Sequence, residues 1–273
     1  MQDRDALTTL AWLVEAGADE AVAEAPVNRL TAKPLAPPVP VSAKPRPAPP
    51  SAPLPPAPSL AGSDAIGDAQ RAAAAARNLE ELKAAMEGFE GSALKRGATN
   101  TVFADGTPGG RIMFIGEAPG RDEDRIGKPF VGRAGQLLDK MMASIDLDRG
   151  RNCYITNVIN WRPPDNRDPS PEEAAICLPF LRRHIELANP GIIVLLGAVA
   201  ARHVMGVTEG IMRTRGRWLE YRVGEAMVPV MPTLHPAYLL RQPAHKKLAW
   251  RDLQAVASRM EALRLPEPAV RVS

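Results

Sequence analysis

The chain has 273 residues, of which 45% are hydrophobic, and its 34 Lys and Arg residues against 31 Asp and Glu residues give a formal net charge of +3. We expect no transmembrane helix, because no run of about 18 apolar residues is present, and no signal peptide, because the N-terminus is acidic. Two cysteines, Cys153 and Cys177, are too few for a disulfide framework and are expected as thiols in a reducing compartment.

Composition divides the chain into four parts. Residues 1–25 carry a short helix-like pattern of apolar residues around Trp12, which fits either a peptide that docks on a partner protein or a marginal isolated helix. Residues 26–62 predict a Pro- and Ala-rich disordered linker, since 13 of them are proline. Residues 63–265 are expected to form a folded domain, and residues 266–273 a C-terminal tail.

Helix and strand signals alternate through the folded part. The first expected elements are a helix over Ala69–Gly88, a strand over Arg111–Gly116, a helix over Gly135–Ile145, a strand over Cys153–Val158 and a helix from Pro171 to about Ala188. The last of these helices begins with a capping box, because Ser170 is followed by proline and, three residues later, by Glu173.

The second half continues the alternation. It carries an apolar strand over Gly191–Gly197, a helix over Ala198–Met205, paired strands over Trp218–Val223 and Ala226–Val230, and a closing helix over Lys246–Leu263. This order predicts an α/β fold, a three-layer α/β/α sandwich around a central, mostly parallel four-stranded sheet.

Three polar residues follow the ends of different strands. Glu117 lies in the glycine-flanked turn Gly116–Gly120, Asn157 ends the second strand, and His235 follows the last strand. Because the carboxyl ends of parallel strands share one edge of a sheet, we expect these side chains to converge on one pocket. Taken singly, each has an alternative: a solvated glutamate in an ordinary turn, a turn-capping asparagine and a structural histidine.

Five ordered blocks together resemble one family. They run Gly116-Glu117-Ala118-Pro119-Gly120-Arg121-Asp122-Glu123-Asp124, Gly127-Lys128-Pro129-Phe130-Val131-Gly132-Arg133-Ala134-Gly135, Tyr154-Ile155-Thr156-Asn157-Val158, Arg162-Pro163-Pro164-Asp165-Asn166-Arg167 and His235-Pro236-Ala237-Tyr238-Leu239-Leu240-Arg241. In order and spacing they resemble the family 4 uracil-DNA glycosylases over roughly residues 75–263. The resemblance implies the fold of that superfamily and hydrolysis of the bond between uracil and deoxyribose in DNA.

The resemblance also implies roles for the uracil-binding residues. A base inside a duplex must be flipped into a pocket and read on its Watson–Crick edge. Asn157 would then accept from uracil N3–H and donate to O4, a pattern that cytosine reverses. Phe130 would stack on the base, with a core aromatic as the alternative. Glu123 would narrow the space around C5 and so reject thymine, or else serve only as an acid in the first turn of a helix.

The same resemblance gives His235, Glu117 and Asn166 catalytic roles. His235 would lie near uracil O2 and stabilise the charge on the departing base. Glu117 would position the attacking water and stabilise an oxocarbenium-like sugar, with help from Asn166, because Ala118 stands where family 1 enzymes carry an aspartate. The segment with Tyr238, Leu239, Leu240 and Arg241 resembles the family's loop whose apolar side chain wedges into the duplex while nearby cations hold phosphates. Arg162 and Arg167, in the loop from Trp161 to Pro171, are also expected to contact the DNA backbone.

One departure concerns the iron–sulfur cluster that family 4 enzymes bind with four cysteines. The four ligand positions fall on Leu79, Leu82, Trp161 and Cys177, so a single ligand remains. We therefore expect no cluster, no other metal and no cofactor. The large apolar replacements predict a hydrophobic plug that fixes the same elements.

The resulting prediction is a monofunctional uracil-DNA glycosylase of base-excision repair. It is expected to be a cytoplasmic, nucleoid-associated monomer that binds single- or double-stranded uracil-DNA and the abasic product, with a possible protein partner for its N-terminal arm and no membrane. Two alternatives stay open: a non-catalytic or slow sensor of uracil or abasic DNA, and a glycosylase that prefers hypoxanthine or xanthine.

Overall fold

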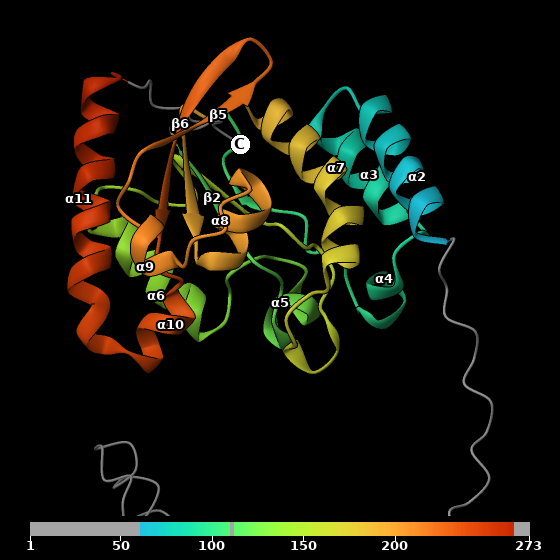
Figure 1. The fold of residues 1–273 in the computed structure, drawn as a ribbon, viewed down its shortest axis with the longest axis horizontal. Helices are drawn as coiled ribbons and strands as arrows, with labels where there is room; N and C mark the ends of the chain where they lie inside the picture. Colours follow the sequence, from blue (N-terminus) through green and yellow to red (C-terminus); the bar gives the residue numbers. More distant parts are fainter. Residues whose placement is uncertain (1–60, 110–111, 265–273) are drawn as a thin grey trace, which may run out of the picture. The chain divides into compact units, whose positions relative to one another are not determined.

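The computed structural model describes residues 61–109 and 112–264 (Figure 1). The predicted helix-like segment, nearly all of the linker and the C-terminal tail lie outside the described residues. The folded part begins at helix α2 (Ala61–Ala75), which is followed by α3 (Leu79–Gly88). A single helix over Ala69–Gly88 was therefore wrong. Asn78 starts a new helix there, because its side chain accepts a hydrogen bond from the Glu81 N–H at 2.7 Å and so caps α3.

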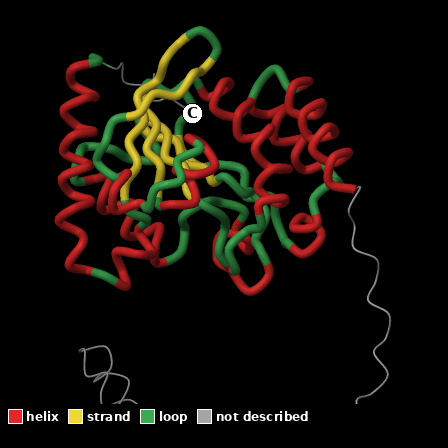
Figure 2. Tube along the Cα trace, in the orientation of Figure 1, coloured by secondary structure: helices red, strands yellow, loops and turns green. Residues whose placement is uncertain are grey.

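A six-stranded sheet forms the centre of the fold, with strand order β1-β3-β2-β4-β6-β5 (Figure 2). The strands are β1 (Asp105–Gly106), β2 (Ile112–Gly116), β3 (Cys153–Asn157), β4 (Ile192–Leu196), β5 (Leu219–Val223) and β6 (Ala226–Thr233). The four inner strands β3, β2, β4 and β6 are mutually parallel, and β1 and β5 pair antiparallel at the two edges. The predicted four-stranded parallel sheet is thus confirmed as the centre of a larger sheet.

Helices cover both faces of the sheet. Besides α2 and α3 they are α4 (Ala93–Gly97), α5 (Arg121–Ile126), α6 (Arg133–Ala143), α7 (Pro171–Ala188), α8 (Ala198–Met205), α9 (Ile211–Thr214), α10 (Pro236–Arg241) and α11 (Lys246–Ala262). No helix within residues 61–109 and 112–264 is both long and apolar enough to cross a membrane.

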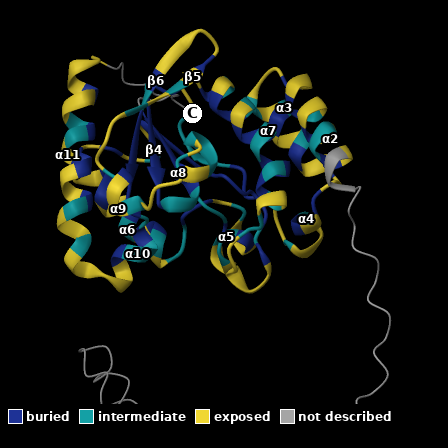
Figure 3. Ribbon diagram, in the orientation of Figure 1, coloured by how far each residue is buried: buried dark blue, intermediate teal, exposed yellow. Residues whose placement is uncertain are grey.

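Alternate residues of β2 enter two separate hydrophobic cores. Met113 and Ile115 pack in a cluster with residues of α2, α3, α7 and α8, whereas Ile112 and Phe114 pack with residues of α6 and α11. Successive side chains of a strand point to opposite faces, so a strand covered on both sides is apolar throughout. Figure 3 shows the central strands as buried, and the three-layer α/β/α prediction is confirmed.

The predicted capping box at the start of α7 is present. The Ser170 hydroxyl accepts from the Glu173 N–H at 3.2 Å, and Glu173 Oε2 accepts from the Ser170 N–H at 2.8 Å. Near the other end of the domain, the segment after His235, which the family resemblance implied to be a loop, forms the short helix α10. Pro236 at its first position and the His235 side chain as its cap start this helix.

Candidate active site

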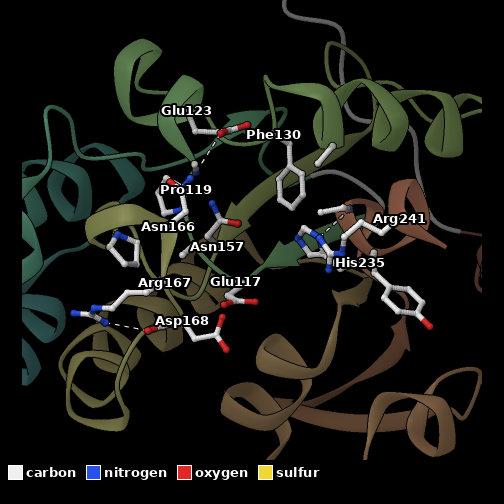
Figure 4. Close-up of a pocket in the computed structure, with 16 residues that line it drawn as sticks. Glu117, Pro119, Glu123, Phe130, Asn157, Asn166, Arg167, Asp168, His235 and Arg241 are labelled. Carbon is white, nitrogen blue, oxygen red and sulfur yellow. Dashed lines mark hydrogen bonds between the residues drawn. The ribbon is translucent and has the colours of Figure 1, made fainter. Parts of the chain in front are cut away.

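A cavity of about 480 Å³ lies where the parallel strands end, and Figure 4 shows the side chains that line it. Glu117 reaches it from the turn after β2, Asn157 from the end of β3, and His235 from the segment between β6 and α10. Phe130 enters from the loop between α5 and α6. The structure therefore brings together side chains that lie up to 118 positions apart in the chain. The volume is that of a pocket for a small molecule.

Asn157 is the most deeply buried polar group of the cavity, with 1% of the residue exposed. Its Oδ1 is buried and has no hydrogen-bond partner among the described residues. Buried polar atoms are nearly always paired, because an unpaired one loses its bonds to water without replacement. This carboxamide is consequently an acceptor that a ligand can satisfy.

Phe130 has a left-handed backbone, with φ of 55°. Its ring is buried and faces the His235 ring, with 5.6 Å between the two centroids. Gly116 makes room for this arrangement, since a Cβ atom there would lie 2.5 Å from Phe130 Cζ. The ring thus forms a flat apolar wall beside the Asn157 carboxamide (Figure 4).

The His235 imidazole is held in one tautomer. Its Nδ1 accepts a hydrogen bond from the Ala237 N–H at 3.1 Å, so in the neutral ring the proton resides on Nε2. Burial lowers the pKa of His235 to about 4, and the nearby Arg241 guanidinium acts in the same direction. At neutral pH the residue is therefore an uncharged imidazole that carries its N–H on Nε2.

Glu117 lies beside a second carboxylate, Asp168 (Figure 4). Burial raises the pKa of Glu117 above its usual value, the charge of Asp168 raises it further, and Arg202 opposes both effects. The sequence analysis missed Asp168. The sequence offered one signal, which is that Asp168 directly follows the block that ends in Arg167. No pattern in the sequence indicates that this loop lies beside the turn that carries Glu117.

Glu123 and Asn166 also line the cavity. Glu123 is fixed by the backbone around it: Oε1 accepts from the N–H groups of Val131 at 3.0 Å and Gly132 at 2.9 Å, and Oε2 accepts from Gly120 at 3.1 Å. Asn166 is exposed, and its Oδ1 accepts from Arg162 Nε at 2.7 Å. The Asn166 oxygen is thus already occupied, whereas its amide nitrogen donates to no other residue that the structure describes.

Comparison with known proteins identifies the family. A model of the Uracil DNA glycosylase superfamily matches residues 103–254. The chain belongs to the uracil-DNA glycosylase superfamily. It is 42% identical over 163 residues to a type-4 uracil-DNA glycosylase of Thermotoga maritima, covering 59% of this chain and 83% of that protein. Over 154 residues it is 44% identical to the type-4 uracil-DNA glycosylase of Archaeoglobus fulgidus, covering 55% of this chain and 77% of the relative.

The four positions at which the resemblance predicted cluster ligands do not suit an iron–sulfur cluster in this superfamily member. Leu82, Trp161 and Cys177 are fully buried there in one hydrophobic cluster, and Leu79 packs against it. Burial raises the pKa of the Cys177 thiol to about 12, so the one cysteine stays protonated. Across the described residues, no group of three or more His, Cys, Asp or Glu side chains could hold a metal ion. The predicted apolar plug describes the packing of this region.

The structure separates the residues that were expected to contact DNA. Leu239 is 1% exposed and packs in the core, so its assignment as a DNA contact is corrected: it would have to leave the core to reach a duplex. Leu240, its neighbour, is 38% exposed. Tyr238 is bonded through its hydroxyl to His245 Nδ1 at 2.7 Å, and both Tyr238 and Arg241 line the cavity.

The two arginines of the loop before α7 differ in their partners. Arg167 forms a bidentate ion pair with Glu173, at 2.8 and 2.6 Å. Among the residues that the structure describes, Arg162 donates only to the neutral Asn166 side chain. A phosphate would have to compete with a carboxylate for Arg167 but not for Arg162. Arg162 is therefore the more available of these two arginines for a DNA phosphate.

Proposed function

We propose that this chain is a uracil-DNA glycosylase that hydrolyses the N-glycosylic bond of deoxyuridine in DNA and leaves an abasic site, which initiates base-excision repair. The observation that carries the proposal is the buried, unpartnered Oδ1 of Asn157 in a cavity that also presents an aromatic wall and an imidazole N–H. A flipped uracil supplies a partner for each of these groups.

Asn157 reads the base. Its Oδ1 accepts from uracil N3–H, and its Nδ2 donates to uracil O4. Cytosine presents an acceptor at N3 and a donor at N4, so it would leave both halves of the buried carboxamide unpaired. Buried groups without partners reject a ligand far more strongly than a missing apolar contact does. Glu123 also lines the cavity, and in this proposal it narrows the space around uracil C5 and so takes part in the rejection of thymine.

Phe130 supplies the stacking surface for the flipped base. A cavity of about 480 Å³ admits a single nucleobase and not a duplex, so the nucleotide must leave the base stack before it is bound. Leu240 is the residue that we assign to the vacated place in the duplex, because it is the exposed leucine of α10. Arg241 and Arg162 provide positive charge for the flanking phosphates.

His235 stabilises the leaving group. Negative charge develops on the uracil ring as the glycosylic bond breaks, and the Nε2–H of the neutral imidazole donates to O2. Since the backbone N–H of Ala237 fixes the tautomer, the donor is oriented before the substrate arrives. No proton needs to be transferred to the base for this interaction.

Glu117 activates the water on the opposite face of the sugar. Its carboxylate accepts a hydrogen bond from the water and stabilises the positive charge that develops on the deoxyribose. The Asn166 amide, whose oxygen is held by Arg162, offers an N–H donor to the same water. Asp168 keeps the pKa of Glu117 raised, which makes Glu117 a stronger base once it is ionised.

The proposal includes the product, the oligomeric state and the location of the protein. The product is abasic DNA, the protein acts as a monomer at the nucleoid in the cytoplasm, and its N-terminal arm binds a protein partner. The proposed reaction uses only protein side chains and a water molecule.

Incubation of the full chain with single-stranded and duplex oligonucleotides that contain uracil, hypoxanthine or xanthine tests the proposal. Free uracil and alkali-labile sites are expected from both uracil substrates. Absence of both products would reject the proposed activity, and faster release of hypoxanthine or xanthine would reject the substrate. Tight binding to uracil-DNA without release would instead identify a sensor.

A further inference from the structure

The backbone of Phe130 lies in a region that residues with a bulky side chain rarely adopt. Its φ of 55° places it in the left-handed conformation, where the Cβ atom crowds the following carbonyl oxygen. Gly135, in the first turn of α6, packs directly against this backbone: a Cβ atom at Gly135 would lie 1.7 Å from the Phe130 carbonyl oxygen. A loop with this backbone needs contacts that hold it in place.

Arg149 holds the carbonyl side of the loop. Its guanidinium donates to the carbonyl oxygen of Pro129 at 2.8 Å and to that of Phe130 at 2.5 Å. The same group is itself fixed by two carboxylates, Asp139 at 2.7 Å and Asp105 at 3.2 Å. A planar guanidinium can make these four bonds at once, which an ammonium cannot.

Glu123 holds the amide side of the same loop. One carboxylate oxygen accepts from the two N–H groups that directly follow Phe130, and the other accepts from the N–H of Gly120 in the turn that carries Glu117. Hydrogen bonds to an ionised group are the stronger kind. Glu123 therefore ties the stacking loop to the Glu117 turn.

We infer that Arg149 and Glu123 are positioning residues, which clamp Phe130 from opposite sides and so set the plane on which the flipped base stacks. The charges match the backbone groups that they meet, a cation on two carbonyls and a carboxylate on three amides. Arg149 acts through Phe130, because four of its five N–H donors are already used within the protein. The inference rests on the proposed function, and it gives Glu123 a task in addition to its proposed place beside uracil C5 and Arg149 a task without contact with DNA.

A double-mutant cycle with Phe130 tests the inference. Arg149→Met is expected to lower the single-turnover rate of uracil release about 10- to 100-fold, because a small displacement of a positioning group has an effect of that size. In a Phe130→Ala background the same change is expected to lower the rate less than about twofold. Full additivity of the two changes would overturn the inference, since a general loss of structure would act in either background.

Arg151→Met is the matched control. Arg151 lies two residues away on the same turn, is exposed, and has none of the contacts described for Arg149, so its change is expected to leave the rate within about twofold of wild type. Arg149→Lys, which can still donate to one carbonyl, is expected to recover part of the rate. Equal rates for Arg149→Met and Arg151→Met would reject the clamp.

Glu123→Gln provides a second approach if the arginine variant does not fold. It keeps the size of the side chain but weakens its bonds to three N–H groups, and we expect it to be non-additive with Phe130→Ala as well. Failure of the proposed function can be distinguished from failure of the clamp. A wild-type chain that releases no uracil would reject the proposed function by itself. A crystal structure of Arg149→Met or Glu123→Gln then tests the clamp: the Phe130 backbone is expected to leave the left-handed region, and an unchanged φ of Phe130 would overturn the inference.

Discussion

Gly116 and Asn157 lie opposite each other in the parallel pairing of β2 with β3, and a Cβ atom at Gly116 would approach Asn157 Oδ1 to 2.4 Å. The same atom would lie 2.5 Å from the ring of Phe130. Real Cβ atoms do not approach other atoms so closely. Asn157 and Phe130 can therefore lie side by side at the floor of the proposed base pocket only because Gly116 has no side chain.

Gly116→Ala is expected to lower uracil release at least about 100-fold, because the added methyl group displaces both the reading carboxamide and the stacking ring. Gly88→Ala, at the end of α3 where a Cβ atom meets nothing within 4 Å, is the control and should retain wild-type activity. Single-turnover assays on a uracil oligonucleotide measure both variants. Activity of Gly116→Ala within threefold of the control would show that Gly116 is not needed to make room for Asn157 and Phe130.

Asn157→Asp is expected to reduce discrimination between uracil and cytosine by at least about tenfold. A protonated carboxyl group presents one donor and one acceptor in either order, so it fits the Watson–Crick edge of both bases. Matched oligonucleotides with a single uracil or a single cytosine would give the two excision rates. If the variant loses uracil release and gains no cytosine release relative to wild type, Asn157 does not read the base in the way proposed.

The pH profile of kcat/KM is expected to show one acid limb, set by ionisation of Glu117, and no step near pH 6.5. His235 stays neutral down to its pKa of about 4, whereas burial and Asp168 raise the pKa of Glu117 above 4.5. Asp168→Asn removes a like charge and should shift the acid limb to lower pH. A shift to higher pH, or no shift, would show that Asp168 does not act on Glu117.

Leu240→Ala is expected to slow uracil release from duplex DNA about tenfold and from single-stranded DNA less than twofold, since only a duplex has a stack that must be filled. Leu263, which is 40% exposed at the end of α11, offers a control of the same residue type. Leu263→Ala should leave both rates unchanged. An equal effect of Leu240→Ala on both substrates would remove it as the wedge.

Acid stability is expected to depend on His184. This residue is 1% exposed, lies 3.0 Å from the Tyr154 hydroxyl and stacks on Phe103, and burial lowers its pKa to about 3. The folded protein holds His184 neutral, whereas the unfolded chain binds a proton at His184 below pH 6.5. The free energy of unfolding therefore has its full His184 contribution above pH 6.5 and loses it as the pH falls toward 3. From pH 7 to 4.5 the loss is about 2 to 3 kcal/mol.

Urea denaturation of wild type and His184→Gln at the two pH values measures this contribution. The variant keeps a polar partner for Tyr154 but has no imidazole to protonate. Its free energy of unfolding should change less between pH 7 and 4.5 than that of wild type, by about the same 2 to 3 kcal/mol. Equal pH dependence of the two proteins would show that His184 is not the responsible group.

Much of the fold could be predicted from periodicity and from capping signals. The apolar runs of β2 and β4 and the capping box of α7 lie where the sequence placed them. The break between α2 and α3 was missed, because an alanine-rich segment favours helix on both sides of Asn78 and the cap acts against that propensity. The two-residue strand β1 carries no periodic signal, since it exists only through its pairing with β3.

The sequence by itself determined which polar side chains meet at the cavity. The order of strands and the polar residues at their ends selected Glu117, Asn157 and His235, because the carboxyl ends of parallel strands share one edge whatever connects them. Tertiary structure alone decided the rest: that Leu239 is buried and Leu240 exposed, that Asp168 returns to Glu117, and that Arg149 and Glu123 hold Phe130. These facts depend on contacts between segments distant in the chain, which no local pattern of residues records.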